Sequence, residues 1–113
     1  MVKVIKEQPN YAVSETGRVF SIKPNGLVEL KKDISNGYPR VNLNGKKYYV
    51  ANLVANAFIP QQEVNQKIFY IDGNKENCNV ENLIWLSNSD IQFFSHYTVE
   101  YRRYLAEQMR GRA

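Results

Sequence analysis

The first fifty residues alternate between apolar and polar positions, and turn-forming residues interrupt them at short intervals. A period of two is typical of strands that bury one face of a sheet. Turn-forming residues occur at Glu15-Thr16-Gly17, at Pro24-Asn25-Gly26 and at Asn44-Gly45. The last pair predicts a two-residue hairpin turn, because both of its positions need positive φ, which Asn and Gly tolerate. We therefore expect a small, twisted antiparallel sheet, with short strands that include Leu27–Leu30.

Beyond this sheet the spacing of apolar residues changes to three and four. Five apolar residues then fall on one face of a short helix that Pro60 should end: Val50, Leu53, Val54, Ala57 and Phe58. Strand character returns at Ile68–Ile71 and again at Ile84–Leu86. A loop rich in turn-forming residues separates these two segments, and "VENL" is expected to form one helical turn.

The C-terminal part predicts helix. Ser87, Asn88 or Ser89 is expected to cap a helix that carries Asp90 in its first turn, where the helix dipole favours an acid. Thr98 either continues this helix or starts a second one. Two apolar stripes are expected on these helices: Ile91, Phe94 and Tyr97, followed by Tyr101, Leu105 and Met109.

Composition narrows the class of protein. The chain has 113 residues, of which 43% are hydrophobic, so one folded domain with a buried core is expected. No apolar run approaches the roughly 20 residues of a membrane span, and no charged-then-apolar leader opens the chain. Cys78 is the single cysteine, which excludes an internal disulfide and a multi-cysteine zinc site. We expect a cytoplasmic protein that does not associate with membranes.

The net charge of +4 is unevenly distributed. Residues 1–50 carry a balance of +5, residues 51–98 a balance of −3 and residues 99–113 a balance of +2. Any contact with phosphates is therefore expected mainly at the two ends of the chain. Eight basic residues are the candidates for binding nucleic acid: Arg18, Lys31, Lys32, Arg40, Lys46, Lys47, Arg102 and Arg103.

Three segments together carry a resemblance to a known family. They are "YAVSETGRVFSI", "GYPRVNLNGKKYYVANLVANAFIP" and "IFYIDGNKENCNVENLIWLS". In their order and in their residues, these segments resemble HNH homing endonucleases of the phage and intron type, which are often preceded by a small DNA-binding module. The resemblance covers Tyr11 to Asp90. The resemblance implies an α+β fold with three parts, which we expect to form one compact unit. These are an N-terminal antiparallel β-sheet module (1–49), a ββα-type HNH-like core (50–98) and a C-terminal basic helix (99–113).

The departures from the family fall on the catalytic positions. In the family a His serves as general base, and Asp, Asn or His donors hold a divalent metal ion beside the scissile phosphate. The resemblance places Tyr70 at the base position, Phe69 and Ile91 at metal-ligand positions, and Ala51 at a further His position. A tyrosine with an ordinary pKa of about 10 is a poor base at neutral pH. The sequence therefore predicts an intact frame without the reactive groups.

A few polar residues remain near this segment. Asp72 and Asp90 are the weak candidates for a metal site, although a turn in "IDGN" and a helix start explain them more simply. His96 is the only histidine, and a surface or packing role is favoured over a catalytic one. Asn82 matches the middle Asn of the HNH motif, which in the family fixes the loop by hydrogen bonding.

Three functions stay open at this point. The first is a catalytically inactive, phage-encoded HNH-like protein that binds DNA through its basic residues and needs no cofactor. The second is an inhibitor or modulator of a host bacterial protein, or a homodimer, through the aromatic C-terminal segment. The third is an active HNH nuclease with an atypical site, and Mg²⁺ would be needed only in that case.

Overall fold

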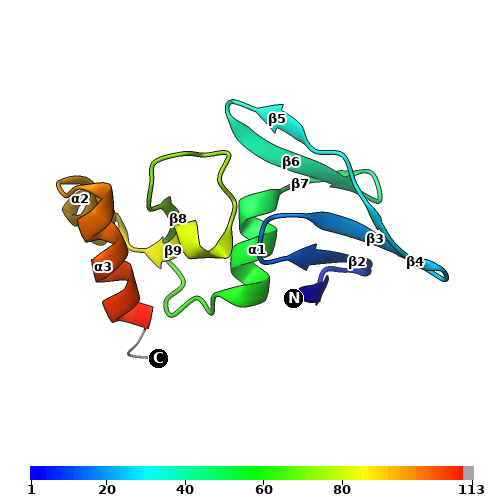
Figure 1. The fold of residues 1–113 in the computed structure, drawn as a ribbon, viewed down its shortest axis with the longest axis horizontal. Helices are drawn as coiled ribbons and strands as arrows, with labels where there is room; N and C mark the ends of the chain where they lie inside the picture. The colour runs from blue at the N-terminus through cyan, green and yellow to red at the C-terminus, as the bar shows by residue number, and fades with distance from the viewer. Residues whose placement is uncertain (111–113) are drawn as a thin grey trace.

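The computed structural model describes residues 1–110, which form an elongated molecule with three small sheets (Figure 1). The first sheet has four antiparallel strands in sequential order. They are β1 (Val2–Ile5), β2 (Gln8–Ser14), β3 (Val19–Lys23) and β4 (Gly26–Glu29). The turn around Gly17 between β2 and β3, and the Pro24-Asn25 turn between β3 and β4, lie where the sequence predicted them. The observed fold is α+β, as expected.

The second sheet is a three-stranded meander. Its strands are β5 (Asp33–Ser35), β6 (Tyr38–Leu43) and β7 (Lys46–Tyr49). The predicted Asn44-Gly45 turn is confirmed, with φ of 55° and 84°. A second turn of the same kind joins β5 to β6 at Asn36-Gly37, with φ of 54° and 87°. This turn and strand β5 were not predicted from the sequence, although Asn-Gly is a strong hairpin signal.

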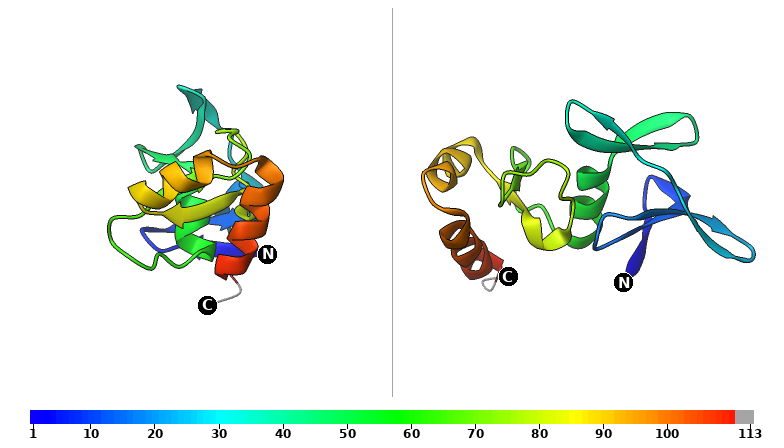
Figure 2. Two further views of the ribbon diagram at one scale, coloured as in Figure 1. Left: turned by 90° about the vertical axis from the view of Figure 1, so that its left-hand side faces the viewer. Right: turned by 45° about the horizontal axis from the view of Figure 1, so that its top comes forward.

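The ββα unit follows. Helix α1 (Val50–Phe58) matches the prediction, and Asn52 and Asn56 are exposed on it. Strands β8 (Lys67–Tyr70) and β9 (Leu83–Leu86) form a two-stranded sheet, and the one-turn helix η1 (Val80–Asn82) precedes β9. Helix α1 lies between the N-terminal sheets and this hairpin (Figures 1 and 2).

Two hydrophobic clusters hold these layers together. The first cluster draws buried residues from both N-terminal sheets, α1 and β9, including Val13, Leu43, Val54 and Leu83. Gly17 joins this region to the loop before η1, because a Cβ at Gly17 would lie 3.0 Å from the Cβ of Cys78. The second cluster is smaller and lies between the β8–β9 hairpin and the C-terminal helices. Its buried members are Ile71, Ile84, Leu86, Phe94 and Ala106.

Two helices close the described chain. Helix α2 (Asn88–Ser95) is capped by Ser87, whose side chain accepts a hydrogen bond from the backbone N–H of Asp90. Thr98 starts a separate helix, α3 (Val99–Arg110), and its hydroxyl accepts from the N–H of Tyr101.

The expected apolar stripe on α3 is largely wrong. Tyr101 and Met109 are exposed, Leu105 is partly buried, and Ala106 is the fully buried residue. Residues 111–113, which the expected C-terminal basic helix included, lie outside the described residues. No helix within 1–110 is long and apolar enough to span a membrane.

Candidate functional site

Strand β8 carries two of the four positions at which the resemblance implies catalytic chemistry. Phe69 faces the second hydrophobic cluster, where its ring centroid lies 5.7 Å from that of Phe94. Ile91, on α2, packs against the same cluster. The implied metal-ligand positions are thus occupied by apolar side chains that contribute to packing. Neither has an atom that can coordinate a cation.

Tyr70, at the implied base position, is half-buried beside the first cluster. Its ring centroid lies 6.0 Å from that of Tyr38. Burial, followed by the neighbouring Cys78 and Tyr38, raises the pKa of Tyr70 far above its ordinary value. The phenol therefore keeps its proton at physiological pH and cannot act as a general base. Ala51, at the further implied His position, is buried in α1 and carries no polar group.

The carboxylate of Asp72 is hydrogen-bonded within the loop between β8 and η1. Its Oδ1 accepts hydrogen bonds from the backbone N–H of Asn74 and from Nδ2 of Asn82, both at 2.8 Å. Its Oδ2 accepts from Nδ2 of Asn77 at 2.9 Å. Burial alone would raise the pKa of Asp72, but these bonds and the charge of Arg103 outweigh burial and lower the pKa below its ordinary value. The turn-building role expected from the sequence matches these contacts.

Asp90 and His96 belong to α2 and its C-cap, not to the loop that contains Asp72. Asp90 is exposed in the first turn of α2, and His96 is exposed at the end of that helix. Within residues 1–110, no three His, Cys, Asp or Glu side chains gather closely enough to hold a metal ion. The divalent metal that the fold implies therefore does not fit the residues present, and no catalytic step can be derived through it.

Arg102 has a structural role that sequence analysis missed. Its guanidinium donates to the carbonyl oxygens of Phe94 (3.0 Å), Ile71 (3.2 Å) and Ser95 (3.3 Å). The group also lies 5.5 Å from the centre of the Phe69 ring. Arg102 thus joins α3 to the end of α2 and to β8. No periodicity or motif signals such a contact, because its acceptors are backbone carbonyls and one of them, that of Ile71, lies 31 residues away in sequence.

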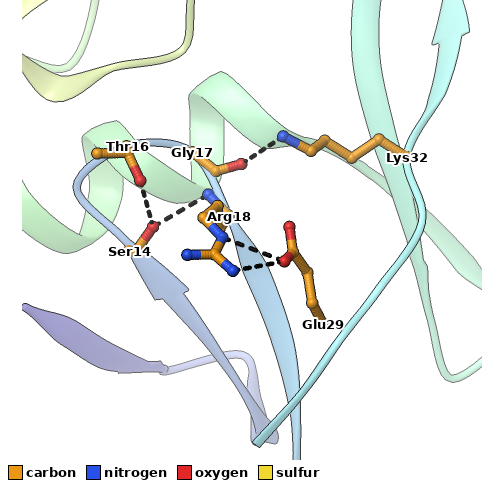
Figure 3. A network of polar contacts seen from close by, with 6 residues as sticks. All are labelled: Ser14, Thr16, Gly17, Arg18, Glu29 and Lys32. Carbon is orange, nitrogen blue, oxygen red and sulfur yellow. Dashed lines mark hydrogen bonds and ion pairs between the residues drawn. The ribbon is translucent and has the colours of Figure 1, made fainter.

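Two of the candidate DNA-binding cations lie in a polar network beside the first sheet (Figure 3). Arg18 makes an exposed ion pair with Glu29, in which Nη2 and Oε1 are 2.7 Å apart. Lys32 donates from Nζ to the carbonyl oxygen of Gly17 at 2.9 Å. Lys31 is exposed, as is Arg103 on α3.

Three further candidates lie on the second sheet. Arg40 and Lys47 both bind Asp33, at 3.1 Å and 2.7 Å. Lys46 instead lies over the ring of Tyr48, with Nζ 5.4 Å from the centroid. The structure therefore brings Arg40 and Lys47 together and separates them from Lys46.

A shallow depression separates this sheet from β8. It is lined by Tyr38, Tyr49, Asn52, Ile68 and Tyr70. The Nζ of Lys75 lies 4.8 Å from the Tyr38 ring centroid, next to this depression. The sequence did not predict that these residues lie together, although the family resemblance had already placed Tyr70 at the base position.

Comparisons with known proteins agree with this architecture. Residues 2–44 match the NUMOD4 motif. The chain is 37% identical over 84 residues to DNA endonuclease I-HmuI of Bacillus phage SP01, covering 69% of this chain and 47% of that protein. It is 34% identical over 94 residues to H-N-H endonuclease F-TflII of Escherichia phage T5, covering 78% and 48% respectively. The chain thus spans about half the length of these relatives.

A solved structure of I-HmuI, which concerns DNA binding and cleavage by that enzyme, resembles the fold with a TM-score of 0.71. The sequence identity in this comparison is 34%, and the match covers 95% of this chain and 66% of the I-HmuI chain. Together with the strand, loop and helix order described above, these matches show that the chain belongs to the HNH homing-endonuclease family.

Proposed function

We propose that this protein binds DNA and does not cleave it. The observation that carries this proposal is the environment of Phe69 and Ile91, whose side chains pack in an apolar cluster where the family places metal ligands. Tyr70, held protonated by burial, replaces the general base. General-base catalysis contributes about 10²–10⁴-fold to a rate, and metal activation of water adds a further large factor. Loss of both leaves no efficient route to hydrolysis.

DNA binding is supported by the relatives and by the distribution of charge. The I-HmuI structure concerns DNA binding, and the basic candidates of this chain lie on its N-terminal sheets and on α3. Arg102 and Lys32 are tied to backbone carbonyls, so we assign them mainly to the fold. Lys31, Arg40, Lys47 and Arg103 keep donors for phosphate. Affinity for duplex DNA should fall steeply as the salt concentration rises.

A plasmid-nicking assay in Mg²⁺ or Mn²⁺ tests the absence of cleavage. We expect no nicking above the background of a Tyr70→Phe variant prepared in parallel. Metal-dependent nicking that disappears in Asp72→Ala or Asp90→Ala would contradict the proposal and establish an active nuclease with an atypical site. A phage HNH enzyme assayed beside it verifies that the conditions support cleavage.

A second candidate function is binding to a host bacterial protein or to a second copy of the chain. Four exposed aromatic rings follow one another along α2 and α3, with centroid separations of 5.1 Å, 4.7 Å and 5.8 Å. They are Phe93, Tyr97, Tyr101 and Tyr104. Light scattering tests self-association, and pull-down after nuclease treatment separates protein binding from bridging by DNA. The phage relatives support a phage-encoded protein acting in the bacterial cytoplasm.

A further inference from the structure

The two faces of the β5–β6–β7 sheet differ sharply in character. Pro39, Val41 and Leu43 of β6 are buried, and the last two belong to the first hydrophobic cluster. Tyr38, Arg40 and Asn42 alternate with them and therefore point to the opposite side. We call this opposite side the outer face.

Strand pairing extends the outer face across all three strands. Asp33 of β5 lies opposite Arg40, and Arg40 lies opposite Tyr49 of β7. Asn42 lies opposite Lys47. Directly paired residues share one face of a sheet, so these side chains form one continuous surface.

Asp33 organises the charges of this surface. Its two oxygens bind Arg40 Nε at 3.1 Å and Lys47 Nζ at 2.7 Å, so one carboxylate fixes two cations. The three groups carry one net positive charge. A guanidinium has five N–H donors and an ammonium has three, so both cations retain donors after binding Asp33. These free donors suit phosphate oxygens, which accept strong charge-assisted hydrogen bonds.

The outer face continues into the depression beside Tyr70. Tyr38 and Tyr49 belong both to the outer face and to the lining of the depression. Lys75 adds a positive charge at this boundary, over the ring of Tyr38. Cations thus lie on both sides of Tyr38, with Arg40 and Lys47 on the outer face and Lys75 beside the depression that contains Tyr70.

We propose that the outer face is where the duplex lies, with Arg40 and Lys47 bound to its phosphates and Asp33 acting as their positioning residue. This inference rests on the proposed DNA-binding function and assigns it to one surface. The occupant is the sugar–phosphate backbone because the surface combines net positive charge with fixed, partly free donors. The depression beside Tyr70 receives the adjoining stretch of the same backbone.

Lys46 and Lys47 provide a matched pair for the test. They are adjacent and equally charged, but Lys46 pairs with the buried Leu43 and so belongs to the other face. Binding of a fluorescent mixed-sequence duplex is measured by anisotropy across a series of salt concentrations. Lys47→Ala should weaken binding and reduce the slope of log affinity against log salt by about one. Lys46→Ala should leave both nearly unchanged.

The outcomes separate this inference from the function on which it rests. If the wild-type protein binds no duplex at low salt, the proposed function fails. If it binds and Lys46→Ala weakens binding as much as Lys47→Ala, DNA binding stands and the assignment to the outer face is wrong. Thermal unfolding of each variant identifies any loss that comes from unfolding.

Asp33→Asn tests the positioning role, and Glu29→Gln is its matched control. Each variant removes one carboxylate and releases an arginine, but Glu29 and Arg18 lie on the other sheet. Removing a negative charge by itself should strengthen DNA binding. We expect Asp33→Asn to weaken binding nevertheless, because Arg40 and Lys47 lose their fixed positions, while Glu29→Gln binds as well as wild type or better. Tighter binding by Asp33→Asn would show that Asp33 only repels DNA.

Discussion

Asp72 and Asn82 hold each other through both backbone and side chain. The backbone N–H of Asp72 donates to Oδ1 of Asn82 at 2.9 Å, and Nδ2 of Asn82 returns a bond to Oδ1 of Asp72 at 2.8 Å. Nδ2 of Asn82 also donates to the carbonyl oxygen of Asn77 at 3.0 Å. These bonds close the loop between β8 and η1. The best-preserved part of the motif is therefore the part that shapes the backbone.

Replacing Asn82, which is buried, with Ala should lower the free energy of unfolding by about 2–4 kcal/mol, because it leaves partly buried backbone groups of Asp72 and Asn77 without partners. Urea denaturation measures this loss. Asn56→Ala, at an exposed position of α1, is the control and should change stability by about 0.5 kcal/mol or less. Equal effects of the two substitutions would contradict the role assigned to Asn82.

Lowering the pH should remove the contribution of ionised Asp72 to the stability of the fold. Its pKa is lowered in the folded state, so its ionised form stabilises the fold above the ordinary pKa of 3.8, and this contribution is lost as the pH falls through the folded-state pKa. Asp72→Asn should therefore show a weaker loss of stability than wild type between about pH 5 and pH 2. Denaturant midpoints measured across this range provide the test. Parallel pH profiles for the two proteins would show that Asp72 is not a source of the acid sensitivity.

A histidine introduced at the implied base position should not by itself produce cleavage. Tyr70→His supplies an imidazole, but Phe69 and Ile91 still offer no donors for a divalent cation. We expect no nicking of plasmid DNA by this variant in Mg²⁺ or Mn²⁺. Cleavage by Tyr70→His would mean that a cation binds through residues other than those at the implied ligand positions.

A carboxylate placed at an implied metal-ligand position should lower the free energy of unfolding. Phe69→Asp replaces an aromatic ring of the second hydrophobic cluster with a carboxylate, and we expect a loss of at least about 2 kcal/mol. Phe93→Asp is the matched control, because the Phe93 side chain is 50% exposed. Thermal unfolding of both variants measures the difference. A tolerated Phe69→Asp would show that this cluster is not essential to the fold.

Arg102→Lys should destabilise the junction of α2, α3 and β8 by about 1.5–3 kcal/mol, since an ammonium cannot reproduce the planar arrangement that reaches three carbonyl oxygens. Arg103→Lys, at the neighbouring exposed position, should have little effect on unfolding. Hydrogen exchange of the α3 amides locates the change. Unaltered exchange in α3 of Arg102→Lys would remove Arg102 from this role.

Local signals in the sequence predicted much of the fold. Asn44-Gly45 has φ values that few other residue pairs tolerate, and Ser87 lies where a helix needs a cap. Both depend on neighbours in sequence. Helix α3 was harder to predict, because its buried side is set by the packing of Ala106 in the second hydrophobic cluster and by the contact of Arg102 with the distant Ile71. A hydrophobicity pattern favours Tyr101 and Met109 at such positions, yet both are exposed.

For the site, the sequence predicted which residues occupy the implied catalytic positions but not how their side chains pack. The apolar packing of Phe69 against Phe94 and the pairing of Asp33 with both Arg40 and Lys47 depend on tertiary contacts and strand register. A count of basic residues treats Lys46 and Lys47 alike. Alternation along a strand puts them on opposite faces, but only the register shows that Lys47 is the one that shares a face with Asp33 and Arg40.

The contact of Gly17 with Cys78 has a mechanical consequence. It fastens the first sheet to the loop before η1, while the first hydrophobic cluster ties both sheets and β9 to α1. Such close-packed layers cannot slide past one another without opening voids in the core. The distance between the outer face and β8 is therefore fixed by the packing of the core. A duplex bound to both, as proposed, would therefore meet a surface of fixed shape, and its affinity would depend on how easily its sequence adopts that shape.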